Sequence, residues 1–291
     1  MKAKFISVLA VLATAALSLA AFAVPASASA AKAGVTPCQR AIFFGAHGLG
    51  EGAAGTAPGT AHWGSRVELV FRQFQWSLMA AHKPLPEDVS VNYPQVNIDP
   101  KATAWRQFFQ ANTARNVANS GSGQLVKQLQ AEHKACPSQA FVISGYSQGA
   151  WVVDKALHNL YSTSKNQSLG AEARAILHQI KFVFLMGDPA FPPDAAPNGG
   201  YGIATGLDFG YSKADYNNNG LSQGAFMSEC LTGDPICNTI HGISDISDTS
   251  LNVHKFGYEH KNVICDTGGG NLDNLSYPLA RCGGSTMAAT V

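Results

Sequence analysis

Charged side chains are scarce in this sequence. Asp, Glu, Lys and Arg make up 13% of the 291 residues, about half the share usual in globular proteins. Twenty basic and nineteen acidic residues leave a formal net charge of +1, and no run of Lys or Arg occurs. These features argue against a nucleic-acid partner, because phosphate backbones are bound through clustered basic side chains.

Long apolar runs are also lacking, except at the amino terminus. Lys2 and Lys4 precede the apolar stretch 5–24, and small residues offer cleavage sites after Ala28 and Ala30. This pattern is typical of a secretory signal peptide, whereas a membrane anchor needs a longer unbroken run. We therefore expect the first thirty residues to be removed and the protein to be secreted and extracellular, without stable membrane insertion.

The remaining chain, 31–291, is long enough for one large domain with a substantial core. Apolar runs and helical 3–4 spacings alternate along it, which favours a parallel sheet with helices on both faces, an α/β fold of three layers. The predicted strands cover 40–44, 89–93, 140–143 and 182–186. The predicted helices cover 64–82, a segment from Ser120 or Ser122 to before Pro137, the segment after Ser147 to about Tyr161, and 170–178, with 102–115 left between helix and loop.

The alternation stops after Pro189. Residues 190–229 are rich in Gly, Asn, Pro and Tyr and show little periodicity. A stretch of this length without regular structure is usually functional or an insertion in a compact domain. We interpret it as an inserted loop.

The chain contains six cysteines, all of them beyond the predicted signal peptide. An even number in an exported chain indicates disulfides, with fifteen possible pairings. Sequence order favours bridges between neighbouring cysteines, which would close two short loops. The two cysteines that remain would then join the start of the first strand to the segment before 140–143. No C-x-x-C or paired-His spacing predicts a zinc site, so we expect no metal. The expected pairs are Cys230–Cys237, Cys265–Cys282 and Cys38–Cys136.

The pentapeptide Gly145-Tyr146-Ser147-Gln148-Gly149 follows an apolar run and precedes a predicted helix. A G-x-S-x-G sequence between strand and helix is the nucleophile elbow of serine hydrolases. Its glycines are needed because a Cβ at either position would crowd the sharp turn. The helix that follows directs its positive end toward the site, which suits a developing oxyanion.

A serine nucleophile requires a base, and the base requires a carboxylate, which follow in the order Ser, acid, His in α/β-hydrolases. Among the downstream acids, Asp234 is favoured because the expected Cys230–Cys237 bridge would hold it rigidly. Asp188 is the main alternative, although it could simply cap the turn before Pro189. Spacing alone does not choose among the downstream histidines. The acids considered are Asp188, Asp234, Asp245, Asp248 and Asp266, and the histidines are His241, His254 and His260.

Several motifs together resemble the cutinases, a family of secreted serine esterases. They are a Cys before the first strand, His47-Gly48-Leu49-Gly50-Glu51, Tyr93-Pro94, the elbow with Tyr146 and Gln148, Gly187-Asp188-Pro189, the loop from Cys230 to Cys237 with Gly233-Asp234, and His254-Lys255-Phe256-Gly257-Tyr258. The resemblance implies Ser147 as nucleophile, Asp234 as acid and His254 as base. It also implies the Cys38–Cys136 and Cys230–Cys237 bridges, and a lidless α/β-hydrolase fold of about five parallel strands.

The expected oxyanion hole departs from the family pattern. Cutinases usually have Arg-Gly-Ser or Arg-Gly-Thr where this chain has His47-Gly48-Leu49. The backbone N–H groups of Leu49 and Gln148 are the donors that the resemblance implies, but Leu49 has no hydroxyl to add a third. Loss of one donor can cost about 3 kcal/mol of transition-state stabilisation.

The motifs together predict a monomeric carboxylic ester hydrolase that needs no metal or cofactor. Its expected substrate is a cutin-like polyester, or a lipid or short-chain acyl ester, hydrolysed through an acyl-enzyme. An acetylxylan esterase acting on acylated polysaccharide, or a phospholipase, would use the same three residues. A further alternative is a weakly active or non-catalytic binding protein on the same scaffold, suggested by Leu49 and the predicted insertion.

Overall fold

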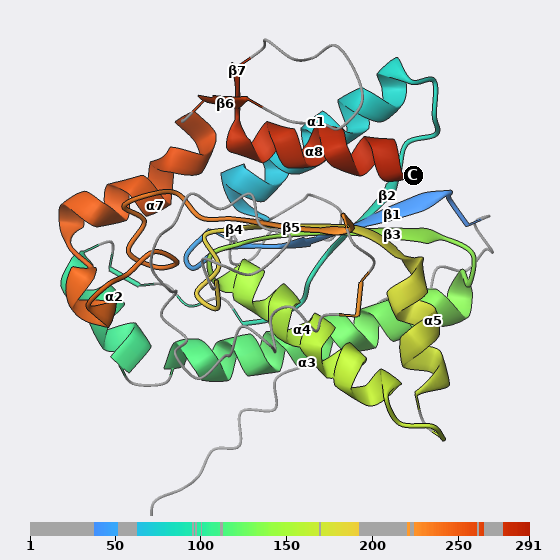
Figure 1. The fold of residues 1–291 in the computed structure, drawn as a ribbon, viewed down its shortest axis with the longest axis horizontal. Helices are drawn as coiled ribbons and strands as arrows, with labels where there is room; N and C mark the ends of the chain where they lie inside the picture. Colours follow the sequence, from blue (N-terminus) through green and yellow to red (C-terminus); the bar gives the residue numbers. More distant parts are fainter. Residues whose placement is uncertain are drawn as a thin grey trace, which may run out of the picture. The chain divides into compact units, whose positions relative to one another are not determined.

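A parallel sheet of five strands forms the centre of the structure (Figure 1). The strands are β1 (Ala41–Ala46), β2 (Glu87–Ser90), β3 (Ala140–Tyr146), β4 (Ile180–Met186) and β5 (Phe226–Glu229). They are hydrogen-bonded in the order β2-β1-β3-β4-β5, and every neighbouring pair is parallel. The predicted parallel sheet of about five strands is confirmed.

The structure is a computed structural model. It describes residues 38–51, 63–94, 96, 98–99, 101–110, 113–168, 170–191, 220–221, 224–260, 262–264 and 276–291. These residues belong to one compact unit, Cys38–Val291. The predicted signal peptide lies outside the described residues, as does most of the predicted insertion 190–229. Within the described ranges, no helix has the length and apolar character needed to cross a bilayer.

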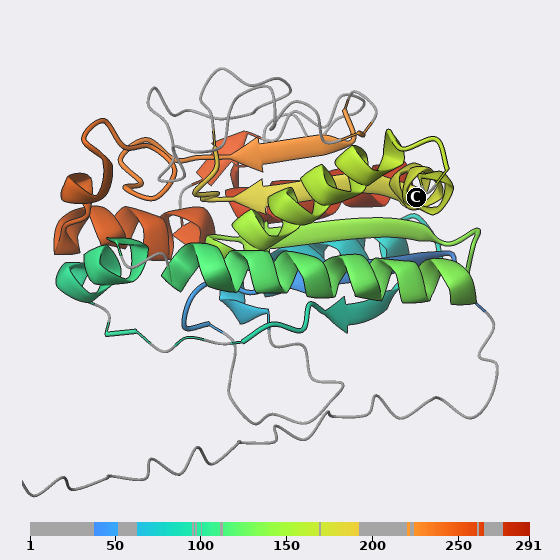
Figure 2. The ribbon, with the colours of Figure 1, turned by 90° about the horizontal axis from the view of Figure 1, so that it is seen from below.

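Helices cover both faces of the sheet, as predicted (Figures 1 and 2). Helices α1 and α8 lie on one face, and α3, α4 and α5 lie on the other. A short antiparallel pair of strands precedes α8. The elements are α1 (Gly64–Ala80), α2 (Ala102–Gln110), α3 (Thr113–Ala135), α4 (Gln148–Ser164), α5 (Ala171–Gln179), the 3-10 helix η1 (Gly242–Asp245), α7 (Asp248–His260), β6 (Asn262–Ile264), β7 (Ser276–Pro278) and α8 (Leu279–Thr290).

Strand β1 shows how one short run supplies both cores. Successive side chains of a strand point to opposite faces, so Ile42 and Phe44 join the core beneath α3 and α4. Phe43 joins the core beneath α1, where its ring lies 5.1 Å from that of Trp63 and 4.9 Å from that of Phe71. Each fully buried side chain of this size contributes about 2 kcal/mol, which explains why β1, buried on both faces, is apolar at every position.

Two disulfides lie within the described residues. Cys38 is bonded to Cys136, which ties the start of β1 to the end of α3. Cys230 is bonded to Cys237 in the loop after β5. Both predicted pairings are confirmed. The third predicted pair, Cys265–Cys282, lies outside the residues whose side chains are described.

Helix α8 was not predicted from the sequence. Two glycines bring it against the rest of the fold, because a Cβ on Gly283 would lie 2.2 Å from Phe184 and one on Gly284 would lie 2.3 Å from the carbonyl oxygen of Val70. Met287 is buried in the core shared with α1. The helix therefore completes the second core, although its own sequence is rich in small residues.

Several element bounds differ from the predictions. Ser122 does not cap a helix, because α3 already begins at Thr113 and the Ser122 hydroxyl donates to the carbonyl of Asn119 (2.9 Å), as interior serines commonly do. Strand β2 covers Glu87–Ser90 rather than 89–93, because β1, its partner among the described residues, ends one residue beyond the Gly45–Ser90 pair. The last residues of the predicted insertion form β5, whose four residues are too few to show a period.

Burial of Glu229 predicts that the stability of the fold depends on pH. Its carboxyl is buried at the end of β5, and Oε2 has no hydrogen-bond partner among the described residues. Burial raises the pKa of Glu229 from 4.5 to about 7. Between these two pH values the folded protein holds a proton that the unfolded chain releases, so the free energy of unfolding should fall with rising pH, by at most about 3 kcal/mol.

Glu229→Gln should remove this loss, because an amide carries no charge at any of these pH values. Urea unfolding of both proteins from pH 4 to pH 8 measures it. The variant should be more stable than the wild type above pH 7 and similar to it at pH 4. Equal pH slopes for the two proteins would contradict the prediction.

Candidate active site

Ser147 occupies the sharp turn between β3 and α4. Its φ of 54° is positive, which a residue with a side chain rarely adopts. The Ser147 N–H donates to the carbonyl of Met186 (2.8 Å), which helps to hold the turn. A Cβ on Gly149 would lie 2.2 Å from the carbonyl oxygen of Ala46, and one on Gly145 would lie 2.6 Å from that of Gly149. Both glycines are therefore required by crowding, as the sequence predicted.

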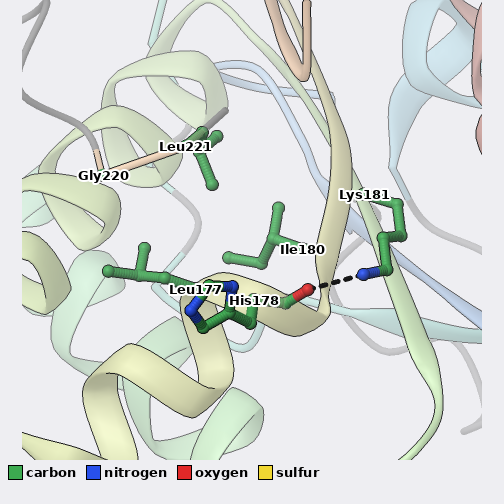
Figure 3. A pocket seen from close by; sticks show the side chains of 6 residues that line it. All are labelled: Leu177, His178, Ile180, Lys181, Gly220 and Leu221. Atoms are coloured by element: carbon green, nitrogen blue, oxygen red, sulfur yellow. Dashed lines mark hydrogen bonds between the residues drawn. The ribbon is translucent and has the colours of Figure 1, made fainter. Parts of the chain in front are cut away.

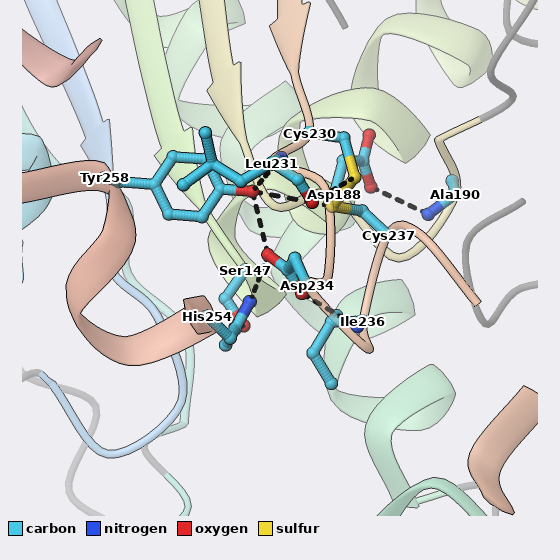
Figure 4. The surroundings of a disulfide bond; sticks show 10 residues. All are labelled: Ser147, Asp188, Ala190, Cys230, Leu231, Asp234, Ile236, Cys237, His254 and Tyr258. Carbon is cyan, nitrogen blue, oxygen red and sulfur yellow. Dashed lines mark hydrogen bonds and ion pairs between the residues drawn. A yellow bond between two sulfur atoms is a disulfide. The ribbon is translucent and has the colours of Figure 1, made fainter. Parts of the chain in front are cut away.

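Ser147, His254 and Asp234 form a continuous chain of contacts. His254 Nε2 lies 2.8 Å from Ser147 Oγ, and His254 Nδ1 lies 2.8 Å from Asp234 Oδ2. Figure 4 shows the three side chains directed toward one another from the elbow, helix α7 and the loop after β5. All three are buried. With its proton on Nδ1, the imidazole donates to the carboxylate and leaves Nε2 free to accept from the serine.

The disulfide loop fixes the orientation of Asp234. Cys230 and Cys237 close the loop around it, and its Oδ1 accepts the backbone N–H of Ile236 (2.8 Å). Its own N–H donates to the carbonyl of Leu231 (3.0 Å). Oδ2 is thereby directed toward His254 (Figure 4).

Tyr258 is a site residue whose contact with the acid the sequence did not reveal. Its hydroxyl donates to Asp234 Oδ2 (2.8 Å) and accepts the N–H of Leu231 (3.2 Å). Burial, reinforced by the nearby Asp234 carboxylate, raises the pKa of Tyr258 well above 10, so the phenol remains a donor. A Cβ on Gly257 would lie 2.5 Å from Leu231. The Gly-Tyr pair after His254 therefore lets α7 approach the loop and place this hydroxyl.

Tyr146 and Trp105 hold the imidazole of His254 from two further sides. The Tyr146 ring stacks on it at 5.0 Å, and the Tyr146 hydroxyl donates to the carbonyl of His254 (2.6 Å). Trp105, on α2, meets the same imidazole edge to face at 5.6 Å. Gly187 lies behind the ring, where a Cβ would be 2.9 Å from His254 Cε1. The ring therefore has little freedom to turn.

The other described acids among the candidates have separate structural contacts. Asp188 Oδ1 accepts the N–H of Ala190 (2.9 Å), which is the turn-capping role considered above (Figure 4). Asp245 accepts the N–H groups of Ile240 and His241, and Asp248 accepts the N–H of Ala102. Among the histidines, His241 is exposed. Asp266 and the side chain of His260 lie outside the described residues.

The loop after β1 carries Leu49, one of the two expected oxyanion donors. Residues 48–51 form a turn in which the N–H of Glu51 donates to the carbonyl of Gly48 (3.2 Å). The Glu51 carboxylate returns to accept the N–H of Gly48 (3.0 Å). Gln148, the other expected donor, is the first residue of α4. Leu49 thus lies in a turn whose two ends, Gly48 and Glu51, are hydrogen-bonded to each other.

His47, which replaces the family's arginine, is buried within this loop. Its ring stacks on that of Tyr93 at 4.2 Å, and the Tyr93 hydroxyl donates to the His47 carbonyl. Burial lowers the pKa of His47, so the imidazole is neutral near pH 7. His47 therefore acts as a packed aromatic side chain that joins the loop to the segment after β2.

A pocket of about 390 Å³ lies elsewhere on the domain (Figure 3). Leu177, His178, Ile180 and Lys181 line it together with 220–221. It opens at the amino end of β4, whereas ligands of parallel sheets bind at the carboxyl ends, where Ser147 lies. Across the described residues, no group of three or more His, Cys, Asp or Glu is placed to hold a metal ion.

Comparison with known proteins identifies the family. The Cutinase family matches residues 80–261, more than half of the chain. The protein belongs to the cutinase family, and its parallel sheet with flanking helices is that of an α/β-hydrolase. Cutinases are carboxylic ester hydrolases. The search of curated proteins gave no match.

Solved structures similar to this chain include three esterase-like proteins. The catalytic core domain of acetyl xylan esterase from Trichoderma reesei is 20% identical (TM-score 0.48), over 74% of this chain and 94% of that chain. A cutinase-like protein from Cryptococcus sp. is 20% identical (TM-score 0.45), over 76% and 93%. A Trichoderma reesei cutinase in complex with a phosphonate inhibitor is 19% identical (TM-score 0.40), over 75% and 73%.

Gly187→Ala should displace the imidazole of His254 and lower the rate of ester hydrolysis. The new methyl group would lie 2.9 Å from His254 Cε1, and a shift of about 1 Å at a reacting group can cost about 100-fold in rate. The measurement is kcat/KM on p-nitrophenyl butanoate.

Gly224→Ala is the matched control. Gly224 also has a positive φ, of 84°, but a Cβ there meets nothing within 4 Å. Both substitutions introduce backbone strain, whereas only the first touches His254. Equal losses of activity in the two variants would show that strain, and not the contact with the imidazole, is responsible.

Proposed function

We propose that this protein is a secreted serine esterase that hydrolyses carboxylic esters through an acyl-enzyme. The observation that carries the proposal is the unbroken chain from Ser147 through His254 to Asp234, with both contacts at 2.8 Å. Ser147 is the nucleophile, His254 the general base and Asp234 the orienting acid. The disulfides support secretion, because such bridges persist in oxidising compartments.

In the first step, Ser147 Oγ attacks the ester carbonyl carbon while its proton passes to His254 Nε2. Asp234 stabilises the imidazolium that forms and keeps its Nδ1 proton directed away from the serine. Tyr258 shares the acceptor oxygen Oδ2 of Asp234, which fixes the carboxylate in the rotamer that meets His254. The tetrahedral intermediate then collapses, and His254 returns the proton to the departing alcohol.

In the second step, water attacks the acyl-enzyme. His254 Nε2 takes a proton from the water, the second tetrahedral intermediate forms, and the serine oxygen leaves with that proton. The products are the carboxylic acid and free Ser147. Because all three side chains are buried, their electrostatic interactions are stronger than they would be in bulk water.

The backbone N–H groups of Leu49 and Gln148 are the proposed oxyanion donors. Gln148 begins α4, where unpaired N–H groups and the helix dipole favour negative charge. Leu49 lies in the turn pinned by Glu51. The chain offers no hydroxyl at Leu49, so the proposed site relies on these two backbone donors.

Aliphatic acyl esters are the proposed substrate class. Trp105 lies edge to face against the imidazole of His254, so an apolar aromatic side chain lies beside the proposed base. An acyl chain can bury against such a surface, whereas an acetyl group has little surface to bury. The expected lidless character stays a prediction, because 52–62 and 192–219 lie outside the described residues.

A fluorophosphonate probe should label the wild-type protein covalently at Ser147. Ser147→Ala should neither label nor hydrolyse p-nitrophenyl butanoate, because the attacking oxygen is gone. Intact-mass spectrometry and a rate assay measure these outcomes. A wild type that labels no more than Ser147→Ala would favour the alternative of a non-catalytic binding protein.

The rate should rise with acyl-chain length from acetate to butanoate and hexanoate. Each added methylene can contribute about 0.8 kcal/mol, or about fourfold in kcat/KM, if it is fully buried. A series of p-nitrophenyl esters measures the trend, and Trp105→Ala should flatten it. Selective turnover of acetate would instead support an acetylxylan esterase, and release of fatty acid from phospholipid vesicles would support a phospholipase.

A further inference from the structure

Arg66 is a buried arginine on α1 that meets three segments of the proposed active site. Its guanidinium contacts the carboxylate of Glu51, in the loop that carries Leu49. Its Nε lies 2.9 Å from Glu259 Oε1 on α7, an ion pair without hydrogen-bond geometry. Its Cζ lies 5.1 Å from the centre of the Tyr146 ring, one residue before Ser147.

Glu51 joins Arg66 to the turn that presents Leu49. Its Oε2 accepts the N–H of Gly48, and the Glu51 N–H donates back to the Gly48 carbonyl, so side chain and backbone close the same turn. Gly48 and Gly64 leave space for this carboxylate, because a Cβ on either would lie 2.8 Å and 2.4 Å from Oε2. The chain is therefore shaped around the Glu51 carboxylate.

Burial raises the pKa of Glu51, while Arg66 acts in the opposite direction and lowers it. Arg66 thus favours the ionised carboxylate, which is the stronger acceptor for the Gly48 N–H. Without a partner, a carboxyl group in this position would take up a proton more readily and hold the turn less firmly.

The other two contacts of Arg66 reach the base and the nucleophile. Glu259 lies five residues after His254 on the same helix. Tyr146, under the guanidinium, stacks on the imidazole of His254 and donates to its backbone carbonyl. One cation therefore links the oxyanion loop, the elbow and the histidine helix, three segments far apart in sequence.

We propose that Arg66 is a positioning residue for ester hydrolysis, which holds the turn of Leu49 in register with Ser147 and His254 through Glu51, Tyr146 and Glu259. The inference rests on the proposed function and adds to it a residue that does not touch the substrate. Buried ion pairs are seldom a source of net stability compared with apolar side chains of the same volume. Stability alone therefore does not require the buried charges of Arg66, Glu51 and Glu259, whereas a role in positioning the active-site segments accounts for them.

The test compares Arg66→Met with Arg66→Lys and the wild type. Met approximates the length of the side chain without its charge, whereas Lys keeps the charge but not the planar guanidinium. Hydrolysis of p-nitrophenyl butanoate should show kcat lower by about 10- to 100-fold in Arg66→Met, with KM changed less than about twofold. Arg66→Lys should recover part of this loss.

A second readout reports on the oxyanion site itself. Ser147 adds to an aliphatic trifluoromethyl ketone to give a tetrahedral oxyanion, whereas the matching methyl ketone remains a neutral carbonyl. The inhibition constant of the trifluoromethyl ketone should rise by about the same factor as kcat falls, and that of the methyl ketone should change little. A purely structural arginine would lower the melting temperature without altering this ratio.

Arg72→Met is the matched control. Arg72 lies on the same helix and pairs with Glu68, but its side chain is 73% exposed, so kcat and both inhibition constants should stay at wild-type values. If Arg66→Met alone does not fold, the double variant Arg66→Met/Glu51→Gln takes its place. The second change removes the negative charge that Glu51 would otherwise bury without its partner. Far-UV circular dichroism checks folding, and this double variant should remain slow.

The outcomes separate this inference from the proposed function. Turnover that survives Ser147→Ala would overturn the proposed function, and this inference with it. Turnover that requires Ser147 but is unchanged in folded Arg66→Met, or in the folded double variant, would overturn the role of Arg66 alone. A selective loss of trifluoromethyl ketone affinity would support it.

Discussion

The strained turn at Ser147 is the constraint on which the rest of the site depends. A positive φ at a serine costs about 1–3 kcal/mol, and the surrounding structure holds it in place. The Ser147 N–H is bound to the end of β4, and Gly149 lets α4 press against the loop after β1. Because these contacts come from neighbouring strands, the turn keeps its shape only while the parallel sheet is intact.

The imidazole of His254 is also held by close packing on several sides. Gly187 gives it room on one side, Tyr146 stacks on another, and Trp105 meets its edge. Such close packing fixes the ring orientation without any hydrogen bond beyond those of its two nitrogens. This is the pre-organisation that acyl transfer demands, since a small displacement of the base costs much of the rate.

Around this centre, the carboxylates of Asp234, Glu51 and Glu259 each lie against a partner side chain. Asp234 receives His254, Tyr258 and the Ile236 amide, and Arg66 joins Glu51 and Glu259. Glu229 departs from this pattern: its Oε2 has no hydrogen-bond partner among the described residues, and the pKa of its carboxyl rises to about 7. Burial alone therefore raises the pKa of Glu229, whereas both carboxylate oxygens of Asp234 in the candidate site have hydrogen-bond partners.

The sequence by itself predicted the features that depend on local pattern. The apolar strands, the elbow glycines and the order of candidate residues are visible along the chain, because backbone geometry and burial act over a few residues. It missed features that depend on partners distant in sequence. Strand β5 is too short to show a period, and α8 owes its place to the contacts of Gly283 and Gly284.

Only the tertiary structure decided which candidate side chains meet. The sequence favoured Asp234 over Asp188 through the expected disulfide loop, spacing did not choose among His241, His254 and His260, and the family resemblance favoured His254. The structure brings Asp234 and His254 to Ser147 and leaves Asp188 on a turn amide. It also revealed Tyr258 and Arg66, whose partners lie 15 to 193 positions away. The physical reason is that hydrogen bonds and ion pairs are fixed by distance in space, which the order of residues along the chain does not encode.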